Sequence, residues 1–108
     1  MNLTGFFIEF ASLEKGPVAM NITYTIDVGQ NINDDLRFYV DLSRATAPIA
    51  CVLSSFVSTT GAEITLTDGF NFGYNGASQP GTDAFNYIVT DVNGHASMGT
   101  IAVNVQAT

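Results

Sequence analysis

One stretch of the chain gathers oxygen atoms of the kind that bind metal ions: Asn33, Asp34 and Asp35 follow one another directly. Calcium takes six to eight oxygen ligands, several of them from carboxylates. Asp91 and Asn93 could complete such a set if the fold brought them near. The alternative is a strand-joining turn whose side chains accept hydrogen bonds from their own backbone. Calcium is therefore the one cofactor that the sequence offers.

Catalytic chemistry has fewer candidates. The chain has one histidine, His95, and one cysteine, Cys51. A nucleophilic triad needs the imidazole beside an activated nucleophile, and a zinc site needs several histidine or cysteine ligands. Cys51 lies in an apolar run with no cation closer in sequence than Arg44, so a reactive thiolate is not expected. We predict no catalytic residues and a protein that is not an enzyme.

The elements that carry these residues are predicted to be strands. Apolar residues alternate with polar ones over five segments, which is the period of a half-buried strand: 18–28, 36–42, 70–75, 84–90 and 101–105. Asp68-Gly69 and Asn93-Gly94 are typical of tight hairpin turns. Residues 48–57 are apolar on both faces, which indicates a central strand or one covered by a partner. The pattern predicts an all-β, immunoglobulin-like antiparallel β-sandwich of about seven to eight strands.

The chain is predicted to be a single domain over residues 1–108, in which 16–108 form the sandwich. Residues 1–15 form an extra N-terminal strand or arm, because Phe6, Ile8 and Phe10 alternate with Phe7, Glu9 and Ala11. The first 13 residues contain no Lys or Arg, and Glu9 interrupts their apolar run, unlike a signal peptide. We therefore expect the chain to start at its own Met1 and not to be exported by the usual route.

Residues 68–106 resemble a known family. The stretch GTDAFNYIVTDVNGHASMGTIAVNV, which begins at Gly81, is similar to the closing hairpin of bacterial cadherin-like and VCBS-type immunoglobulin-like domains. The spacing of Asp83 and Tyr87 is similar to a tyrosine corner, in which the hydroxyl bonds to backbone at a sheet corner. Both residues are expected to be structural. The resemblance also implies an acidic, calcium-linked segment after the second strand, and Asn31 to Leu36 keep its acidity without its pattern.

Charge excludes two classes of partner. Three cations face ten carboxylates, for a net charge of −7. Such a surface repels the phosphate backbone of nucleic acids and anionic membranes. No stretch approaches the roughly 20 apolar residues of a membrane-spanning helix. The expected partners are proteins.

The resulting hypothesis is a small virion component that decorates or cements a phage capsid or another virion shell. It would contact the capsid or shell protein, or its own copies in a closed oligomer, through Phe6, Phe7, Ile8 and Phe10. The alternative is a repeat module of a bacterial surface adhesin, exported and located at the cell surface. A third hypothesis is a carbohydrate-binding module, which would need aromatic rings on a concave face or loop; the chain has no tryptophan.

Overall fold

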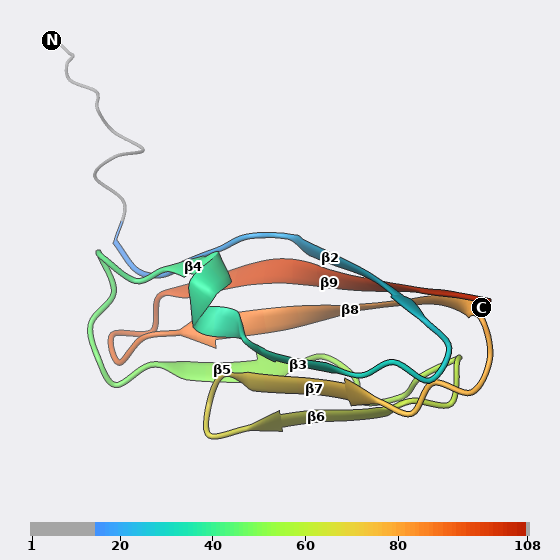
Figure 1. Cartoon of the computed structure of the whole chain (residues 1–108). Helices are drawn as coiled ribbons and strands as arrows, with labels where there is room; N and C mark the ends of the chain where they lie inside the picture. Colours follow the sequence, from blue (N-terminus) through green and yellow to red (C-terminus); the bar gives the residue numbers. More distant parts are fainter. Residues whose placement is uncertain (1–14, 108) are drawn as a thin grey trace, which may run out of the picture.

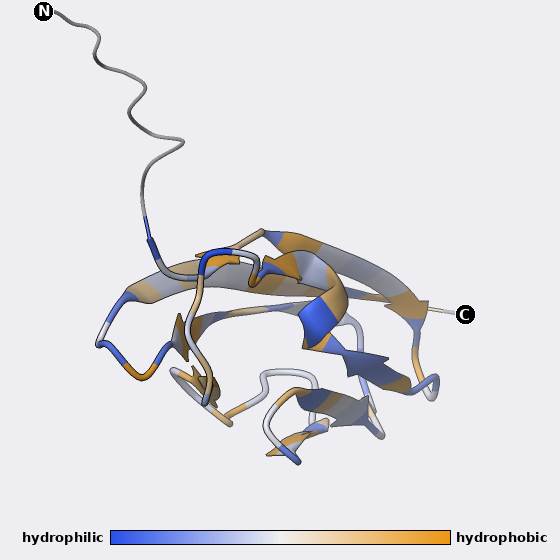
Figure 2. Ribbon diagram, turned by 90° about the vertical axis from the view of Figure 1, so that its left-hand side faces the viewer, coloured by the Kyte–Doolittle hydropathy of each residue, from blue (hydrophilic) through white to orange (hydrophobic). Residues whose placement is uncertain are grey.

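The computed structural model describes residues 15–107, and in this range the chain is all-β (Figure 1). The strands alternate between hydrophobic and hydrophilic residues, as Figure 2 shows. The elements are, in chain order, β1 (Val18–Ala19), β2 (Ile22–Asp27), β3 (Ile32–Asp35), the 3-10 helix η2 (Leu36–Tyr39), β4 (Val40–Asp41), β5 (Ala50–Leu53), β6 (Glu63–Thr67), β7 (Asn71–Asn75), β8 (Gly81–Thr90) and β9 (Ala96–Gln106). No helix in this range has the length and apolar character that crossing a bilayer requires.

The strands form two facing sheets and a small additional pair. One sheet has the order β2-β9-β8-β5, the other β3-β7-β6, and β1 pairs with β4. Aromatic rings from both sheets meet in the core. The ring centroid of Phe72 on β7 lies 5.9 Å from that of Phe85 on β8 and 6.0 Å from that of Tyr24 on β2. The predicted sandwich is therefore present, and its apolar faces pack against each other.

Two hairpins lie where the turn residues predicted them. Asp68 and Gly69, both with positive φ (50° and 84°), join β6 to β7. The Asn93-Gly94 turn joins β8 to β9, whose register runs from Gly81–Val105 to Thr90–Ala96. Positive φ is easily adopted by Gly and tolerated by Asp, so these residues allow the tight reversal.

The sandwich is antiparallel except at one pair. Strands β2 and β9 run parallel, in register from Ile22–Ile101 to Asp27–Gln106. This pairing joins the beginning of the described chain to its end. Sequence periodicity does not distinguish parallel from antiparallel neighbours, since either exposes alternate side chains to one face.

The strand predicted over residues 36–42 is wrong for most of its length. Leu36–Tyr39 form the 3-10 helix η2, and only Val40 and Asp41 continue as a strand. The Asp35 side chain accepts a hydrogen bond from Arg37 N at the start of the turn. Leu36 N donates to Phe70 O and Leu36 is buried, while Phe38 is 77% exposed. The cap and this anchor favour a helical turn over an extended strand.

Residues 48–57 do not form a central strand. Only Ala50–Leu53 are extended, and they form β5 at the edge of the four-stranded sheet. Cys51 and Leu53 point into the core, whereas Val52 is 53% exposed. Phe56 and Val57 beyond the strand are 54% and 79% exposed. The apolar residues of this run therefore belong half to the core and half to the surface.

Candidate binding site

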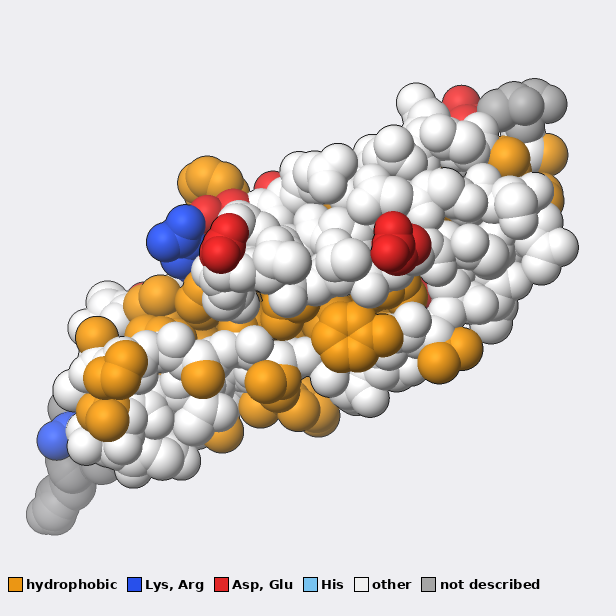
Figure 3. All heavy atoms as spheres, turned by 90° about the horizontal axis from the view of Figure 1, so that it is seen from below, with side chains coloured by type: hydrophobic (Ala, Val, Ile, Leu, Met, Phe, Trp, Pro, Cys, Tyr) orange, Lys and Arg blue, Asp and Glu red, His pale blue; other side chains and the backbone are white. Residues whose placement is uncertain are grey.

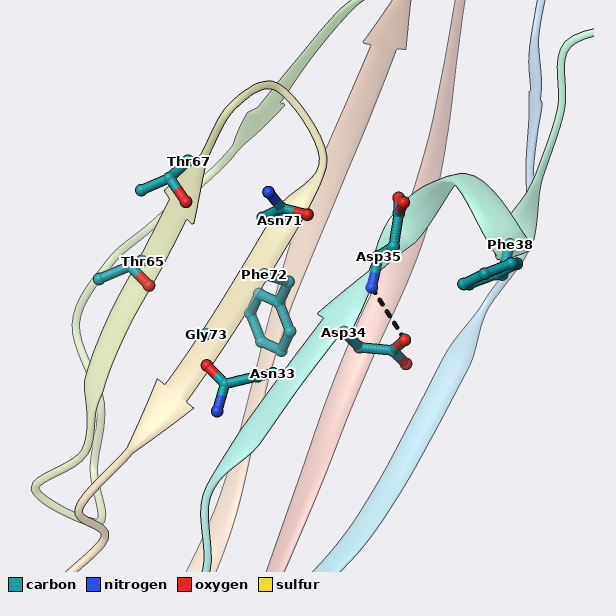
Figure 4. A pocket seen from close by; sticks show the side chains of 9 residues that line it. All are labelled: Asn33, Asp34, Asp35, Phe38, Thr65, Thr67, Asn71, Phe72 and Gly73. Carbon is teal, nitrogen blue, oxygen red and sulfur yellow. Dashed lines mark hydrogen bonds between the residues drawn. The ribbon is translucent and has the colours of Figure 1, made fainter.

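A hollow of about 490 Å³ lies on the outer face of the β3-β7-β6 sheet (Figure 4). Strand register places two rows of outward residues across this face. One row is Asn33, Gly73 and Thr65, and the next is Asp35, Asn71 and Thr67. The complete lining is Asn33, Asp34, Asp35, Phe38, Thr65, Thr67, Asn71, Phe72 and Gly73.

Gly73 forms the floor of the hollow. A Cβ at this position would lie 3.1 Å from Asn75 Nδ2 and 3.6 Å from Asn33 Oδ1, and closer still to Thr65 Oγ1. Three polar groups from three strands thus converge above a residue that has no side chain. A glycine inside a strand often marks a close approach of this kind.

The rim of the hollow carries an ion pair and an exposed ring. The Arg37 guanidinium donates hydrogen bonds to both oxygens of the Asp35 carboxylate. Its Nε lies 3.0 Å from Oδ1 and 3.1 Å from Oδ2, and its Nη2 lies 2.6 Å from Oδ2. This hydrogen bonding to Arg37 lowers the pKa of Asp35. Phe38 belongs to η2, which follows β3, and lies beyond Asp35 in Figure 4. Its ring is largely exposed to solvent.

Asp34 points to the other side of β3, toward two tyrosines. Its Oδ2 accepts hydrogen bonds from Tyr24 Oη at 2.9 Å and Tyr39 Oη at 2.7 Å, and its Oδ1 accepts one from Asp35 N. Burial and the hydrogen bond to Asp34 raise the pKa of Tyr24, and the bond to Asp34 also raises the pKa of Tyr39. Both hydroxyls therefore stay protonated and tie β2 and η2 to β3.

These contacts bear on the calcium hypothesis. Asn33, Asp34 and Asp35 do meet at the hollow, but the carboxylate of Asp34 is bound by tyrosines and that of Asp35 by Arg37. Within residues 15–107, no three or more His, Cys, Asp or Glu side chains gather as a metal ion would need. Calcium would have to displace these partners and still find most of its six to eight oxygens elsewhere.

Asp91 and His95 hold the β8–β9 turn together. Asp91 is 5% exposed and accepts from the backbone N–H groups of Thr46, Asn93 and His95 and from the His95 ring at 3.2 Å. Burial acts to raise the pKa of Asp91, but these hydrogen bonds outweigh it and lower the pKa. Asp91 therefore stabilises the turn that contains Asn93.

Cys51 faces the core, and burial raises the pKa of its thiol to about 11. The protonated thiol is the unreactive form. The His95 ring contacts the Asp91 carboxylate at the hairpin turn. Cys51 thus packs in the core, and His95 takes part in the turn.

Asp83 is the centre of a buried polar cluster. Its carboxylate accepts hydrogen bonds from Ser58 Oγ (2.6 Å), Thr59 N (2.8 Å), Thr59 Oγ1 (2.7 Å) and Tyr74 Oη (2.5 Å). Thr60 contacts both Tyr74 and Asp83. Burial acts to raise the pKa of Asp83, but the bonds from Ser58, Tyr74 and Thr59 outweigh it and hold the pKa at about 2.

Tyr87 is fully buried, but its hydrogen bond differs from that of a tyrosine corner. The hydroxyl donates to Met20 O at 2.6 Å, 67 residues earlier in the chain. A tyrosine corner bonds to backbone only a few residues upstream. Tyr87 therefore ties β8 to the segment between β1 and β2.

A second surface is the outer edge of β5, which pairs with β8 on one side and with no other strand among residues 15–107. Ser54 N donates to Asn86 O of β8, so by alternation the backbone groups of Cys51 and Leu53 point away from β8. Val52, Phe56 and Val57 are exposed beside this edge. Figure 3 shows hydrophobic side chains in a band along this side of the molecule, with acidic side chains to one side of it. The predicted contact residues Phe6, Phe7, Ile8 and Phe10 lie outside the described residues.

The sequence indicated the three β3 residues of the hollow but not its other members. Apart from Phe38, these other members lie on strands some 30 residues or more after β3 in the chain, and include Thr65, Asn71 and Gly73. Gly73, a glycine within an alternating strand, was the one signal that could have indicated a close approach.

No family model matches this chain, and no curated protein does. Solved structures share its fold at low identity. One is a nucleoside hydrolase-related hypothetical protein from Saccharophagus degradans that is associated with carbohydrate metabolism: TM-score 0.63, 12% identity, 84% of this chain and 26% of the other. Another is an endo-fucoidan hydrolase of glycoside hydrolase family 107: TM-score 0.54, 20% identity, 85% of this chain and 14% of the other. The chain thus spans about a quarter and a seventh of these proteins.

Proposed function

We propose that this chain is a non-catalytic assembly domain that binds other protein chains through the β5 edge. The observation that carries the proposal is an uncharged edge strand with exposed apolar neighbours. No Asp, Glu, Lys or Arg occurs between Ala45 and Ala62. Natural edge strands are usually protected by charges, prolines or a covering segment, because unpaired backbone groups recruit further strands.

The other edges of the two sheets differ from β5 in this respect. Strand β2 contains Asp27, β3 contains Asp34 and Asp35, and β6 contains Glu63. Each of these edges thus carries at least one carboxylate, which disfavours a further strand. Among the edges of the two larger sheets within residues 15–107, β5 is the one without a charged residue, and its sequence therefore permits strand addition.

The occupant that fits this edge is the N-terminal segment of a second copy. Phe6, Ile8 and Phe10 alternate with Phe7, Glu9 and Ala11, which is strand periodicity with apolar groups on both faces. Gly16 N donates a hydrogen bond to Arg44 O, so the start of the described chain lies beside the loop that leads into β5. Fourteen extended residues span up to about 50 Å, which is enough to reach a neighbouring molecule.

An assembly role suits the decoration of a capsid or other virion shell, in which small domains associate by symmetric contacts. A module of a bacterial surface adhesin is the second setting. In the solved structures this fold makes up only part of a longer chain, which is also the arrangement that a module would have. The two settings differ in self-association, because a closed oligomer belongs to the first and a monomeric module to the second.

The test is the solution mass of the full chain, measured by light scattering over a range of micromolar concentrations. We expect a closed oligomer that becomes a folded monomer on deletion of residues 1–12 or on Val52→Lys. The substituted lysine places a charge on the edge strand, whereas Thr23→Lys on β2 is a matched control with an exposed residue on the opposite edge. The control is expected to keep the oligomer.

Hydrogen exchange at the amides of Cys51 and Leu53 separates the remaining outcomes. Protection of both amides that is lost on deletion of residues 1–12 supports strand addition. A monomeric full chain with protected amides means that the segment folds back on its own β5, which overturns the assembly proposal. A monomer with unprotected amides overturns it as well and favours the adhesin module.

A further inference from the structure

From the polar lining of the hollow on the β3-β7-β6 face, we infer that it binds a neutral, hydroxyl-rich ligand, namely a sugar residue of an oligosaccharide. The inference is independent of the assembly proposal, since β5 belongs to the other sheet. Four side chains at or beside the hollow, Asn33, Thr65, Thr67 and Asn75, have no hydrogen-bond partner among residues 15–107.

Their convergence is what makes the hollow a candidate site. Three polar atoms from three adjacent strands lie close to Gly73: Asn33 Oδ1, Thr65 Oγ1 and Asn75 Nδ2. Neighbouring strands lie about 4.8 Å apart, so polar groups are presented at regular short intervals across the face. Strands hold these groups more firmly than a loop would, which lowers the entropic cost of binding.

The types of group select the ligand. A carboxamide offers two donors and an acceptor, and a hydroxyl offers one donor and two lone pairs. The hydroxyls of a sugar are likewise donors and acceptors at once, so each side chain can meet one. Pockets that bind small molecules use a few such polar groups to fix orientation.

Charge disfavours the other ligand classes. An anion in the hollow would meet the carboxylate of Asp35, and the nearby cation Arg37 is already committed to Asp35 in a bidentate pair. A cation would need the carboxylates of Asp34 and Asp35, whose oxygens are occupied by Arg37, Tyr24 and Tyr39. A neutral ligand leaves all of these contacts intact.

One end of the hollow provides an apolar contact. Phe38 of η2 lines the hollow and is 77% exposed, and Figure 4 shows it on the far side of Asp35 from Asn71. An aromatic ring is the surface on which the C–H face of a sugar packs, and an exposed one has this face available. The volume of about 490 Å³ lies within the range of small-molecule sites and admits one sugar ring with part of a neighbour.

The test is a titration of the full, isotope-labelled chain with neutral oligosaccharides, followed by amide NMR shifts. The probes are cellohexaose, maltohexaose and xylohexaose, with dextran sulfate and calcium chloride as charged comparators. We expect at least one neutral probe to shift the amides of Asn33, Asn71 and Gly73. The double variant Asn33→Ala, Thr65→Val should weaken that binding by roughly tenfold or more, because two hydrogen bonds are lost.

The control variant is Thr25→Val, an exposed threonine of β2 without a side-chain hydrogen bond among residues 15–107. It should bind as the unaltered chain does. Phe38→Ala should also weaken binding, and since Phe38 is exposed it should leave the fold intact. The inference is overturned if no neutral probe shifts these amides, if only the sulfated polymer or calcium does so, or if the double variant binds unchanged.

Discussion

The buried carboxylate of Asp83 illustrates how a single residue organises this sandwich. It lies on β8, yet its partners Ser58 and Thr59 come from the loop before β6, and Tyr74 comes from the facing sheet. Hydrogen bonds to a charged group are stronger than neutral ones, and a buried carboxylate without them is costly. Asp83 therefore fixes one end of the sandwich by joining both sheets to a loop.

Asp83→Asn should lower the free energy of unfolding by about 2–4 kcal/mol, because an amide cannot accept all these donors. The pKa of about 2 in the folded chain lies below that of an unfolded aspartate, so the stabilisation is full above about pH 4 and is lost as pH falls through 2. Urea unfolding at a series of acidic pH values checks both points.

The contribution of Asp83 to this pH dependence should be about 2 kcal/mol, and it should be missing in Asp83→Asn. Equal pH slopes for both chains between pH 4 and 2 would contradict this account of the cluster.

For single residues, the sequence indicated a structural role for Asp83 and Tyr87 but not which groups they contact. The spacing of Asp83 and Tyr87 indicated two structural side chains, and both are buried. The bond from Tyr87 to Met20 and those from Ser58 and Thr59 to Asp83 join segments far apart in the chain. Local spacing carries no information about such partners.

Single strands were predictable where turn chemistry and alternation agree. The β6–β7 and β8–β9 hairpins combine both signals, and both are present. Residues 36–42 alternate as well, but the Asp35 cap and the anchor of Leu36 at Phe70 override the pattern. Residues 48–57 have no alternation, so the sequence could not tell a central strand from an edge with exposed apolar groups.

Strand β9 contains a position where packing permits no side chain. A Cβ on Gly99 would lie 2.5 Å from both Met20 O and Tyr87 Cε1. Gly99→Ala must push Tyr87 away from Met20 and should cost about 1–3 kcal/mol of unfolding free energy. Met98→Ala, next to it and 61% exposed, should change stability by less than about 0.5 kcal/mol in the same denaturation experiment. Similar losses in both variants would contradict the proposed close packing.

The whole molecule depends on pairings that a single sequence does not contain. Alternation and turn residues predicted the class, an all-β sandwich, but not the order β2-β9-β8-β5 or the parallel contact of β2 with β9. The hollow has the same origin, since its two rows each cross three strands. Both features arise only when strands distant in the chain become neighbours.

The parallel pairing of β2 and β9 has a mechanical consequence. The chain enters β2 at one end of the sandwich and leaves β9 at the other (Figure 1), so a pulling force applied through the two ends slides these strands past each other. Evenly spaced bonds between parallel strands then share the load and must break together. In a single-molecule pulling experiment we expect one abrupt rupture, at a higher force than when the load is applied across the β8–β9 hairpin, which opens bond by bond. Such a domain would transmit tension between whatever is attached to its two ends.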